Sequence, residues 1–253
     1  MEIKNSIALV TGSNGGIGKV FVEQLLKDDV QKIYACARSV AKLEALVSLD
    51  SVRVIPISLE VTDNHSVLAA AEQCSDVSLL INTAGTSFNQ GLIAADDLQL
   101  ARQEMEINYF GMLSLCRAFA PILKNQGGGA IINILSLLGK ANLPFSGSYS
   151  ASKAAAISMT QGIRAELAAQ NTLVVGVMPG TVNTDLAKDW PDPKVEPEEV
   201  VRMSLQAVID GTEDVYPGEQ AQQIVAQLQT DPKGVEKYLA TFLPGMMLAG
   251  TQA

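Results

Sequence analysis

The chain has 253 residues, of which 47% are hydrophobic, and its 27 acidic and 18 basic residues give a formal net charge of −9. This length suits one large domain or two small ones, and the apolar content is enough for a sizeable core. The negative charge argues against a broad nucleic-acid-binding face and against binding to an acidic membrane, so we expect neither partner.

Short apolar runs alternate with stretches of helical periodicity along the chain. Most of the runs lack period-2 alternation and are apolar throughout, which predicts strands buried on both faces of a parallel sheet, at 6–11, 32–37, 53–59, 78–83, 130–135 and 172–178. Helical spacing of apolar residues predicts helices at 15–28, 39–49, 64–74, 96–125 and 148–170. The alternation predicts right-handed βαβ units in a Rossmann-type, doubly wound α/β fold with helices on both faces of the sheet. Because no linker or repeat interrupts the pattern, we expect a single domain over 1–253.

Prolines gather after Met178, where the regular alternation ends. Pro197, followed by Glu198 and Glu199, is typical of a helix start. The preceding segment, 184–196, has little helix or strand character. Such loops in α/β proteins often cover a ligand site, so we expect a substrate lid there, with a plain surface connection as the alternative.

The segment TGSNGGIG, Thr11–Gly18, lies between the first predicted strand and the first predicted helix. Glycine permits backbone conformations and close approaches that other residues do not, and the amino end of a helix attracts anions. The segment therefore predicts either a phosphate-binding turn or a tight turn without a ligand. By contrast, QGGGA at 126–130 precedes a strand rather than a helix, and we interpret it as a plain turn.

Five motifs occur in a fixed order: TGxxxGxG from Thr11, NTAG at 82–85, an Asn-Ser-Tyr-Lys set, YSASK at 149–153 and PGTVNT at 179–184. Together they resemble the short-chain dehydrogenase/reductase family, over about residues 5–215. The resemblance implies a sheet of about seven strands and NAD(P)-dependent oxidoreduction.

The end of the second predicted strand bears on cofactor choice. In dinucleotide folds an acidic residue there binds the ribose of NAD, whereas an arginine accommodates the 2′-phosphate of NADP. Here Ala37 is followed by Arg38 and Ser39, so we expect NADP(H). The family pattern extends the expected cofactor-binding residues to Gly12, Asn14, Gly16, Ile17, Gly18, Arg38, Ser39, Glu60, Val61, Asn82, Ala84, Gly85, Tyr149, Lys153, Pro179, Gly180, Val182 and Thr184. Glu60 stands where the family usually has an aspartate that holds the adenine.

The expected catalytic residues are Asn108, Ser136, Tyr149 and Lys153. Tyr149 and Lys153 are four apart on a predicted helix, so they share a face, and an ammonium nearby is expected to lower the pKa of the phenol. The resemblance implies that Tyr149 exchanges the proton, that Lys153 also grips the nicotinamide ribose, and that Ser136 holds the substrate oxygen. It also implies that Asn108 bends its helix and carries a water that relays protons to Lys153.

Large apolar residues flank this set. Leu137, Leu138, Leu143 and Phe145 lie between Ser136 and Tyr149, and the lid contributes Leu186 and Trp190. We therefore expect an NADPH-dependent carbonyl reductase, or alcohol dehydrogenase in reverse, for apolar or aromatic ketones and secondary alcohols. One alternative is a 3-oxoacyl-[acyl-carrier-protein] reductase, which the acidic lid disfavours, and another is a non-catalytic NADP(H)-binding regulator.

The remaining features argue for what the protein lacks. Its three cysteines are far apart in the sequence, and we expect Cys36 and Cys116 in the core. The single histidine, His65, is expected at the surface. We therefore expect neither a disulfide nor a metal site. The start of the chain shows no signal peptide and no run is long enough to span a bilayer, so we expect a cytoplasmic protein. By resemblance, the helices at 96–125 and 148–170 form subunit contacts, which predicts a tetramer or else a dimer.

Overall fold

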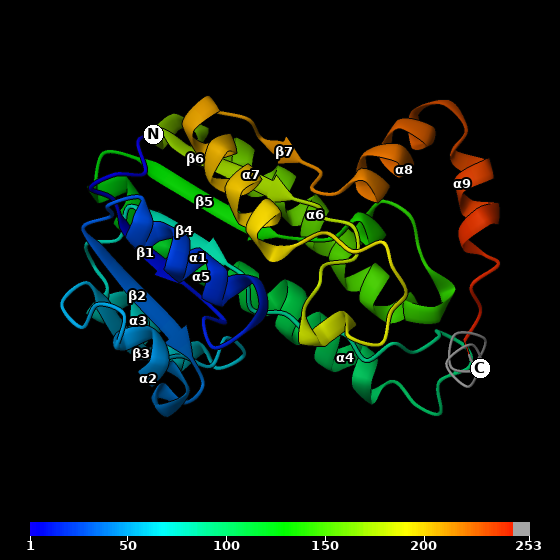
Figure 1. The fold of residues 1–253 in the computed structure, drawn as a ribbon, viewed down its shortest axis with the longest axis horizontal. Helices are drawn as coiled ribbons and strands as arrows, with labels where there is room; N and C mark the ends of the chain where they lie inside the picture. Colours follow the sequence, from blue (N-terminus) through cyan, green and yellow to red (C-terminus); the bar gives the residue numbers. More distant parts are fainter. Residues whose placement is uncertain (245–253) are drawn as a thin grey trace.

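Seven parallel strands form one sheet in the order β3-β2-β1-β4-β5-β6-β7 (Figure 1). The structure is a computed structural model that describes residues 1–244. The strands are β1 (Ile7–Val10), β2 (Lys32–Ala37), β3 (Val54–Ser58), β4 (Leu79–Asn82), β5 (Gly129–Ile134), β6 (Thr172–Val177) and β7 (Asp214–Val215). The order reverses between β1 and β4, and ligands of open α/β sheets bind at the carboxyl ends of the strands beside such a reversal.

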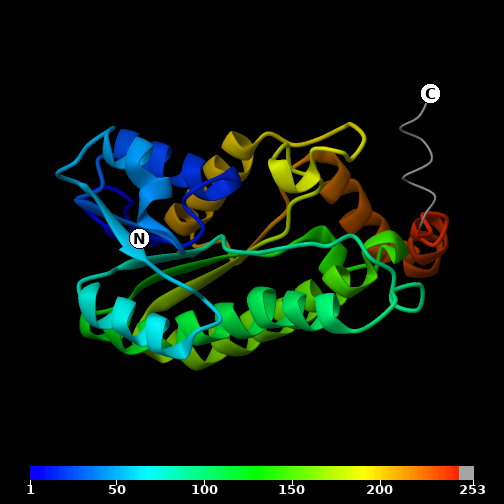
Figure 2. The same cartoon turned by 90° about the horizontal axis from the view of Figure 1, so that it is seen from below.

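Helices cover both faces of the sheet (Figure 2). One face is covered by α1 (Gly16–Lys27), α2 (Glu44–Val47) and α7 (Pro197–Asp210), and the other by α3 (Asn64–Gln73), α5 (Met112–Asn125) and α6 (Gly147–Leu167). The helix α4 (Gln99–Met105) continues through a π-helical segment, Glu106–Gly111, into α5. The helices α8 (Glu219–Thr230) and α9 (Pro232–Leu239) lie beyond the carboxyl ends of the strands. Short 3₁₀ turns occupy Val40–Leu43, Leu137–Gly139, Pro144–Ser146, Ala168–Gln170 and Asp185–Ala187.

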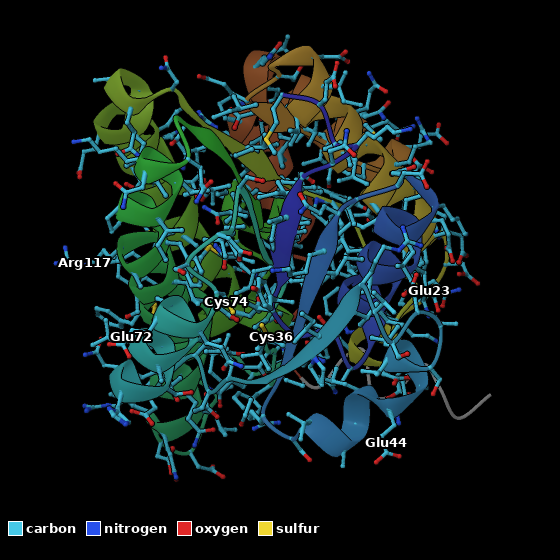
Figure 3. The ribbon with its side chains drawn as sticks, turned by 90° about the vertical axis from the view of Figure 1, so that its left-hand side faces the viewer. Glu23, Cys36, Glu44, Glu72, Cys74 and Arg117 are labelled. Carbon is cyan, nitrogen blue, oxygen red and sulfur yellow. The ribbon has the colours of Figure 1, made fainter. Side chains whose placement is uncertain are left out.

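The core has two layers, one on each side of the sheet. Within β1, Ala8 and Val10 pack with α1 and α7, while Leu9 packs with the α3, α5 and α6 layer. Burial on both faces explains why the strand sequences lack apolar–polar alternation. In Figure 3, Glu72 and Arg117 lie on the outer surface of one helical layer and Glu23 and Glu44 on that of the other.

The fold confirms the predicted Rossmann-type sheet and all six predicted strands, and the resemblance correctly implied a seventh. That strand, β7, has only two residues and no apolar run to announce it. The expected turn is present before β5, with positive φ at Gly127 and Gly128, and the strand begins directly after it at Gly129. Cys36 and Cys116 are buried, and His65 is exposed, also as expected.

Two helical predictions need correction, and two helices were missed. The predicted helix at 39–49 is a 3₁₀ turn followed by the four-residue α2. The predicted 96–125 helix begins only at Gln99, because the Asp97 carboxylate accepts a hydrogen bond from the Gln99 N–H and forms a turn there. The helices α8 and α9 were not predicted. The last nine residues of the predicted 1–253 domain lie outside the described residues, and no helix within 1–244 is long and apolar enough to cross a membrane.

Candidate active site

The buried side chain of Thr11 joins the carboxyl ends of β1 and β4. Its hydroxyl accepts hydrogen bonds from the N–H groups of Thr83 (2.9 Å) and Ala84 (3.0 Å), and the Thr83 hydroxyl donates to the Thr11 carbonyl. These bonds hold the glycine turn after β1 against the segment after β4. The sequence analysis gave Thr11 no role of its own, although its place directly before Gly12 was a signal for one.

The glycine turn leaves the amino end of α1 open to an anion. Gly12 has a φ of +62°, and a Cβ at Gly18 would overlap the Gly12 carbonyl and lie 2.7 Å from Thr83 Oγ1, so only glycine allows this close packing. A Cβ at Gly15 would meet no atom within 4 Å. No side chain caps α1, and its first turn has no acidic residue. Free N–H groups at a helix start, with open space in front of them, fit the pyrophosphate of a dinucleotide.

Ser13 ties this turn to the end of β2. Its N–H donates to the Cys36 carbonyl (2.9 Å), and its hydroxyl accepts from the Cys36 N–H (3.2 Å). Arg38 and Ser39, which follow β2, are exposed. Within residues 1–244 Arg38 forms no salt bridge, so its guanidinium is available for an anion beside the glycine turn.

The predicted adenine-binding residues follow β3. Glu60 Oε1 accepts hydrogen bonds from the Thr62 N–H (3.1 Å) and hydroxyl (2.9 Å), so one carboxylate oxygen is used in a local turn. Val61 is buried against Gly111, where a Cβ would lie 2.9 Å from Val61 Cγ2. The contact of Glu60 with adenine stays a prediction and would depend on its other oxygen.

The segment after β4 presents backbone to the site. The Asn82 side chain points into the interior instead, where its Nδ2 donates to Asn133 Oδ1 (2.8 Å). A Cβ at Gly85 would lie 3.6 Å from Lys153 Nζ and 3.2 Å from Asn108 Oδ1, which places Gly85 beside the predicted catalytic groups. A side-chain contact from Asn82 to the cofactor does not fit this orientation, because the amide is held between the strands.

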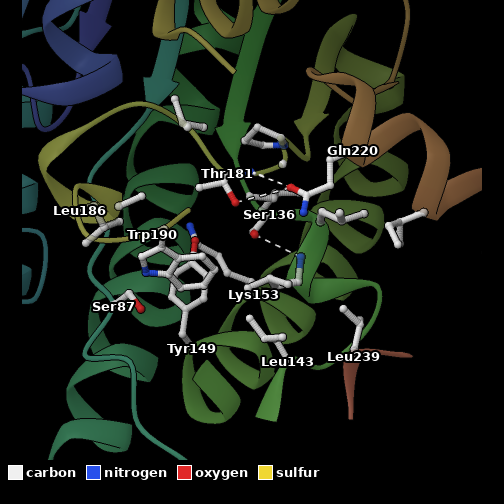
Figure 4. A pocket seen from close by; sticks show the side chains of 18 of the residues that line it. Ser87, Ser136, Leu143, Tyr149, Lys153, Thr181, Leu186, Trp190, Gln220 and Leu239 are labelled. Atoms are coloured by element: carbon white, nitrogen blue, oxygen red, sulfur yellow. Dashed lines mark hydrogen bonds between the residues drawn. The ribbon is translucent and has the colours of Figure 1, made fainter. Parts of the chain in front are cut away.

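The structure brings Ser136, Tyr149 and Lys153 to one cavity (Figure 4). Tyr149 and Lys153 lie one turn apart on α6, and Lys153 Nζ is 5.7 Å from the centroid of the Tyr149 ring. The same ammonium donates to the Ile134 carbonyl (2.9 Å) at the end of β5. Ser136 follows β5, and its hydroxyl accepts from the Leu138 N–H (3.1 Å). A carbonyl oxygen placed here can therefore meet a hydroxyl and a phenol together.

Burial controls the charges of this group. Desolvation raises the pKa of Tyr149 to about 12, with a smaller lowering effect from the Ser136 hydroxyl and a raising effect from the Glu104 charge. Desolvation also lowers the pKa of Lys153 to about 8. The expectation that the Lys153 ammonium lowers the pKa of Tyr149 is thus wrong for the chain by itself, because burial outweighs any ammonium effect. A phenol with so high a pKa stays protonated at neutral pH and can donate its proton.

Asn108 lies within the π-helical segment and is fully buried. Its Oδ1 accepts from the Thr86 N–H (2.9 Å), and its Nδ2 donates to the Thr86 carbonyl (2.9 Å) and to Ser152 Oγ (2.9 Å). These bonds fasten the segment after Gly85 to α6. Because both ends of the amide are engaged, the water relay from Asn108 to Lys153 stays a prediction.

The cavity has a volume of about 800 Å³. Of the predicted substrate residues, Leu138, Leu143, Leu186 and Trp190 line it, as does Leu137. Phe145 does not line it: the ring packs behind Trp190, edge to face at 5.8 Å, in an apolar cluster with α8 and α9. Among the predicted cofactor residues, the cavity is also lined by Ile17, Gly85, Tyr149, Lys153, Pro179, Gly180, Val182 and Thr184.

The sequence analysis missed the third wall of the cavity. It comes from α8, from α9 and from the short turn after α9, and its apolar residues are Ile224, Val235, Tyr238, Leu239 and Phe242. Their apolar residues recur at helical spacing, which was a usable signal. The resemblance ended near residue 215, so this part of the chain was left without an interpretation.

The fold and this site define a dinucleotide-dependent oxidoreductase with a serine, a tyrosine and a lysine at its centre. Residues 6–195 match the family described as short chain dehydrogenase. A crystal structure of a short chain dehydrogenase from Burkholderia cenocepacia J2315 in complex with NADP is 41% identical, with a TM-score of 0.90 over 94% of this chain and 99% of that chain.

Two curated relatives agree. Dehydrogenase/reductase SDR family member 7B of Mus musculus is 32% identical over 196 residues, which is 73% of this chain but only 60% of the mouse protein, so the chain spans less than two thirds of that relative. An uncharacterized oxidoreductase of Staphylococcus saprophyticus is 30% identical over 219 residues, 82% of this chain and 93% of that protein. The chain belongs to the short chain dehydrogenase family and is an oxidoreductase that binds a nicotinamide cofactor.

Proposed function

We propose that the protein is an NADPH-dependent reductase of bulky apolar or aromatic ketones, and that it oxidises the corresponding secondary alcohols in reverse. The observation that carries this proposal is the cavity of about 800 Å³, which joins Ser136, Tyr149 and Lys153 to walls of leucine, tryptophan and α8–α9 side chains. Lys153 is the only basic side chain among the described residues that line it. An anionic substrate would thus find little compensation there, whereas an apolar ketone would be well buried.

The choice of NADPH rests on Arg38. Arg38 directly follows β2, two residues after Cys36, whose N–H is bonded to Ser13 of the glycine turn, and a forked donor such as its guanidinium suits a 2′-phosphate. The Burkholderia cenocepacia relative, whose crystal structure contains NADP, supports the same choice.

In this proposal each residue of the site has a separate task. Bound NADPH supplies the hydride for the carbonyl carbon. Ser136 holds the substrate oxygen, and Tyr149, whose phenol is protonated at neutral pH, donates a proton to it. Lys153 grips the nicotinamide ribose and places its positive charge beside the phenol. The 184–196 segment, with Leu186 and Trp190 over the cavity, acts as a lid that excludes water.

The test is a screen of ketones of increasing size with NADPH and with NADH. The proposal expects NADPH oxidation with bulky apolar ketones and little with sugars or keto acids. Each added methylene that is buried contributes about 0.8 kcal/mol, or about fourfold in kcat/KM, until the cavity is full. A 3-oxoacyl thioester on an acyl carrier protein belongs in the same screen, and turnover restricted to that substrate would refute the proposal.

A further inference from the structure

Glu104, in α4, is a fully buried carboxyl group that the proposed chemistry does not use. Its Oε1 accepts a hydrogen bond from the Phe88 N–H at 2.8 Å. Its Oε2 has no hydrogen-bond partner, and no cation within residues 1–244 forms a salt bridge with it. A carboxyl buried with so few partners is costly, so its presence calls for a function.

Glu104 and Asn108 act on the same stretch of backbone. They are four residues apart and share one face of the helical run. Asn108 binds both the N–H and the carbonyl of Thr86, and Glu104 binds the N–H of Phe88. The two side chains therefore clamp three backbone groups of the segment that follows β4. This segment has neither helix nor strand up to α4, so its position depends on tertiary hydrogen bonds: these side-chain bonds and the bond from the Gly147 N–H to the Gln90 carbonyl (3.0 Å).

The clamped segment supplies one polar part of the substrate cavity. Thr86, Ser87 and Asn89 line the cavity, and Gln220, Gln223 and Gln227 of α8 also bring polar groups to a lining that includes many apolar side chains. The Ser87 hydroxyl lies 3.1 Å from Asn89 Oδ1 and 3.2 Å from the hydroxyl of the buried Ser146. Asn89 has a φ of +50°, in the left-handed region that asparagine adopts more readily than most other residues apart from glycine. Phe88, between the two polar residues, is the residue whose N–H Glu104 holds.

We propose that Glu104 is a positioning residue for substrate binding: through the Phe88 N–H, it holds Ser87 and Asn89 where they meet the ketone. This inference rests on the proposed ketone reduction for its kinetic readout. In this proposal substrate binding depends on a side chain at position 104 long enough to accept the hydrogen bond from the Phe88 N–H, and the charge of that side chain has a smaller effect.

Two conservative variants separate reach from charge. Glu104→Gln keeps the length and the acceptor oxygen but removes the charge, whereas Glu104→Asp keeps the charge but shortens the side chain by one methylene. We expect Glu104→Asp to raise KM for the ketone about tenfold, the upper end of the loss for one ordinary hydrogen bond, with kcat and KM for NADPH changed less than about threefold. Glu104→Gln should stay within about threefold of the parent in all three. Gln103→Asn, the same shortening at an exposed neighbouring position, is the matched control and should change nothing.

An unchanged KM for the ketone in Glu104→Asp would overturn the proposal. So would a rise in Glu104→Gln alone, which would assign the effect to the charge, or an equal rise in both variants, which would show that the charge matters as much as the length of the side chain. Hydrogen exchange of the Phe88 amide tests the clamp without turnover: it should be faster in Glu104→Asp than in the parent and in Glu104→Gln. If the parent protein reduces no ketone, the proposed function is refuted. If the Phe88 amide exchanges at the same rate in the parent and in both variants, the positioning role of Glu104 is refuted, whatever the result with ketones.

Discussion

Replacing Arg38 by alanine tests how the protein chooses its cofactor. Arg38 is exposed, follows β2 directly and forms no salt bridge within the described part of the chain, so its removal should leave the fold intact. A hydrogen-bonded contact between guanidinium and phosphate contributes about 1.5–3 kcal/mol, which corresponds to about ten- to a hundredfold in Kd. Since the site is open to solvent and salt screens it, we expect the lower end of that range.

The assay is fluorescence titration of the protein with NADPH and NADH at low and moderate salt. Arg38→Ala should raise the Kd for NADPH about tenfold and leave that for NADH unchanged, and the difference should shrink as salt is added. Lys124→Ala, the same loss of charge near the end of α5 and before β5, is the control and should affect neither cofactor. Equal losses for NADPH and NADH in Arg38→Ala would refute the assignment of Arg38 to the 2′-phosphate.

Four further outcomes are expected. Tyr149→Phe should reduce turnover below about a percent of the parent while NADPH still binds in a titration, and retained turnover would mean that another group donates the proton. Gly18→Ala should lower the free energy of unfolding by about 1–3 kcal/mol in urea titrations, because its Cβ would overlap the Gly12 carbonyl, whereas Gly162→Ala, with open space around it, should not. Between pH 8 and 10.5, Lys153 keeps its proton in the unfolded chain but has lost it in the native protein, because its pKa is lowered to about 8 on folding. The free energy of unfolding of the parent, compared with that of a Lys153→Met variant, should therefore rise with pH over this range. A difference between the two that does not change with pH would contradict the lowered pKa of Lys153. Light scattering should show a tetramer, or else a dimer, formed through α4–α5 and α6, and a monomer would contradict this expectation.

The order of elements could be predicted because the inner strands of this sheet, such as β4 and β5, are buried on both faces. In β5, Ala130, Ile131, Ile132 and Ile134 are apolar and only Asn133 interrupts the run, a pattern that differs clearly from the helical periodicity that follows. The two-residue β7 has no such run. It pairs with β6 through Gly176 and Val177, a tertiary contact that leaves no periodic signal in the sequence.

The features of the site that follow from the spacing of residues along the sequence could be predicted. The features that depend on packing between distant segments could not. Tyr149 and Lys153 share a helical face whatever surrounds them. The pKa of Tyr149, however, depends on how deeply α6 is buried, and the expected lowering was wrong for that reason. The orientation of Phe145 toward Trp190, and the hold of Glu104 on the Phe88 N–H, likewise depend on contacts between segments distant in sequence.

The most direct test of ketone reduction in this cavity is steady-state oxidation of NADPH with a homologous series of apolar ketones, run on the parent and on Trp190→Ala. The parent should show kcat/KM rising about fourfold per added methylene and then levelling as the cavity fills, with NADH a poorer donor. Trp190→Ala should move the levelling to longer chains, because it removes a wall of the cavity. A response independent of chain length, or a preference for polyhydroxylated substrates, would contradict the proposed function.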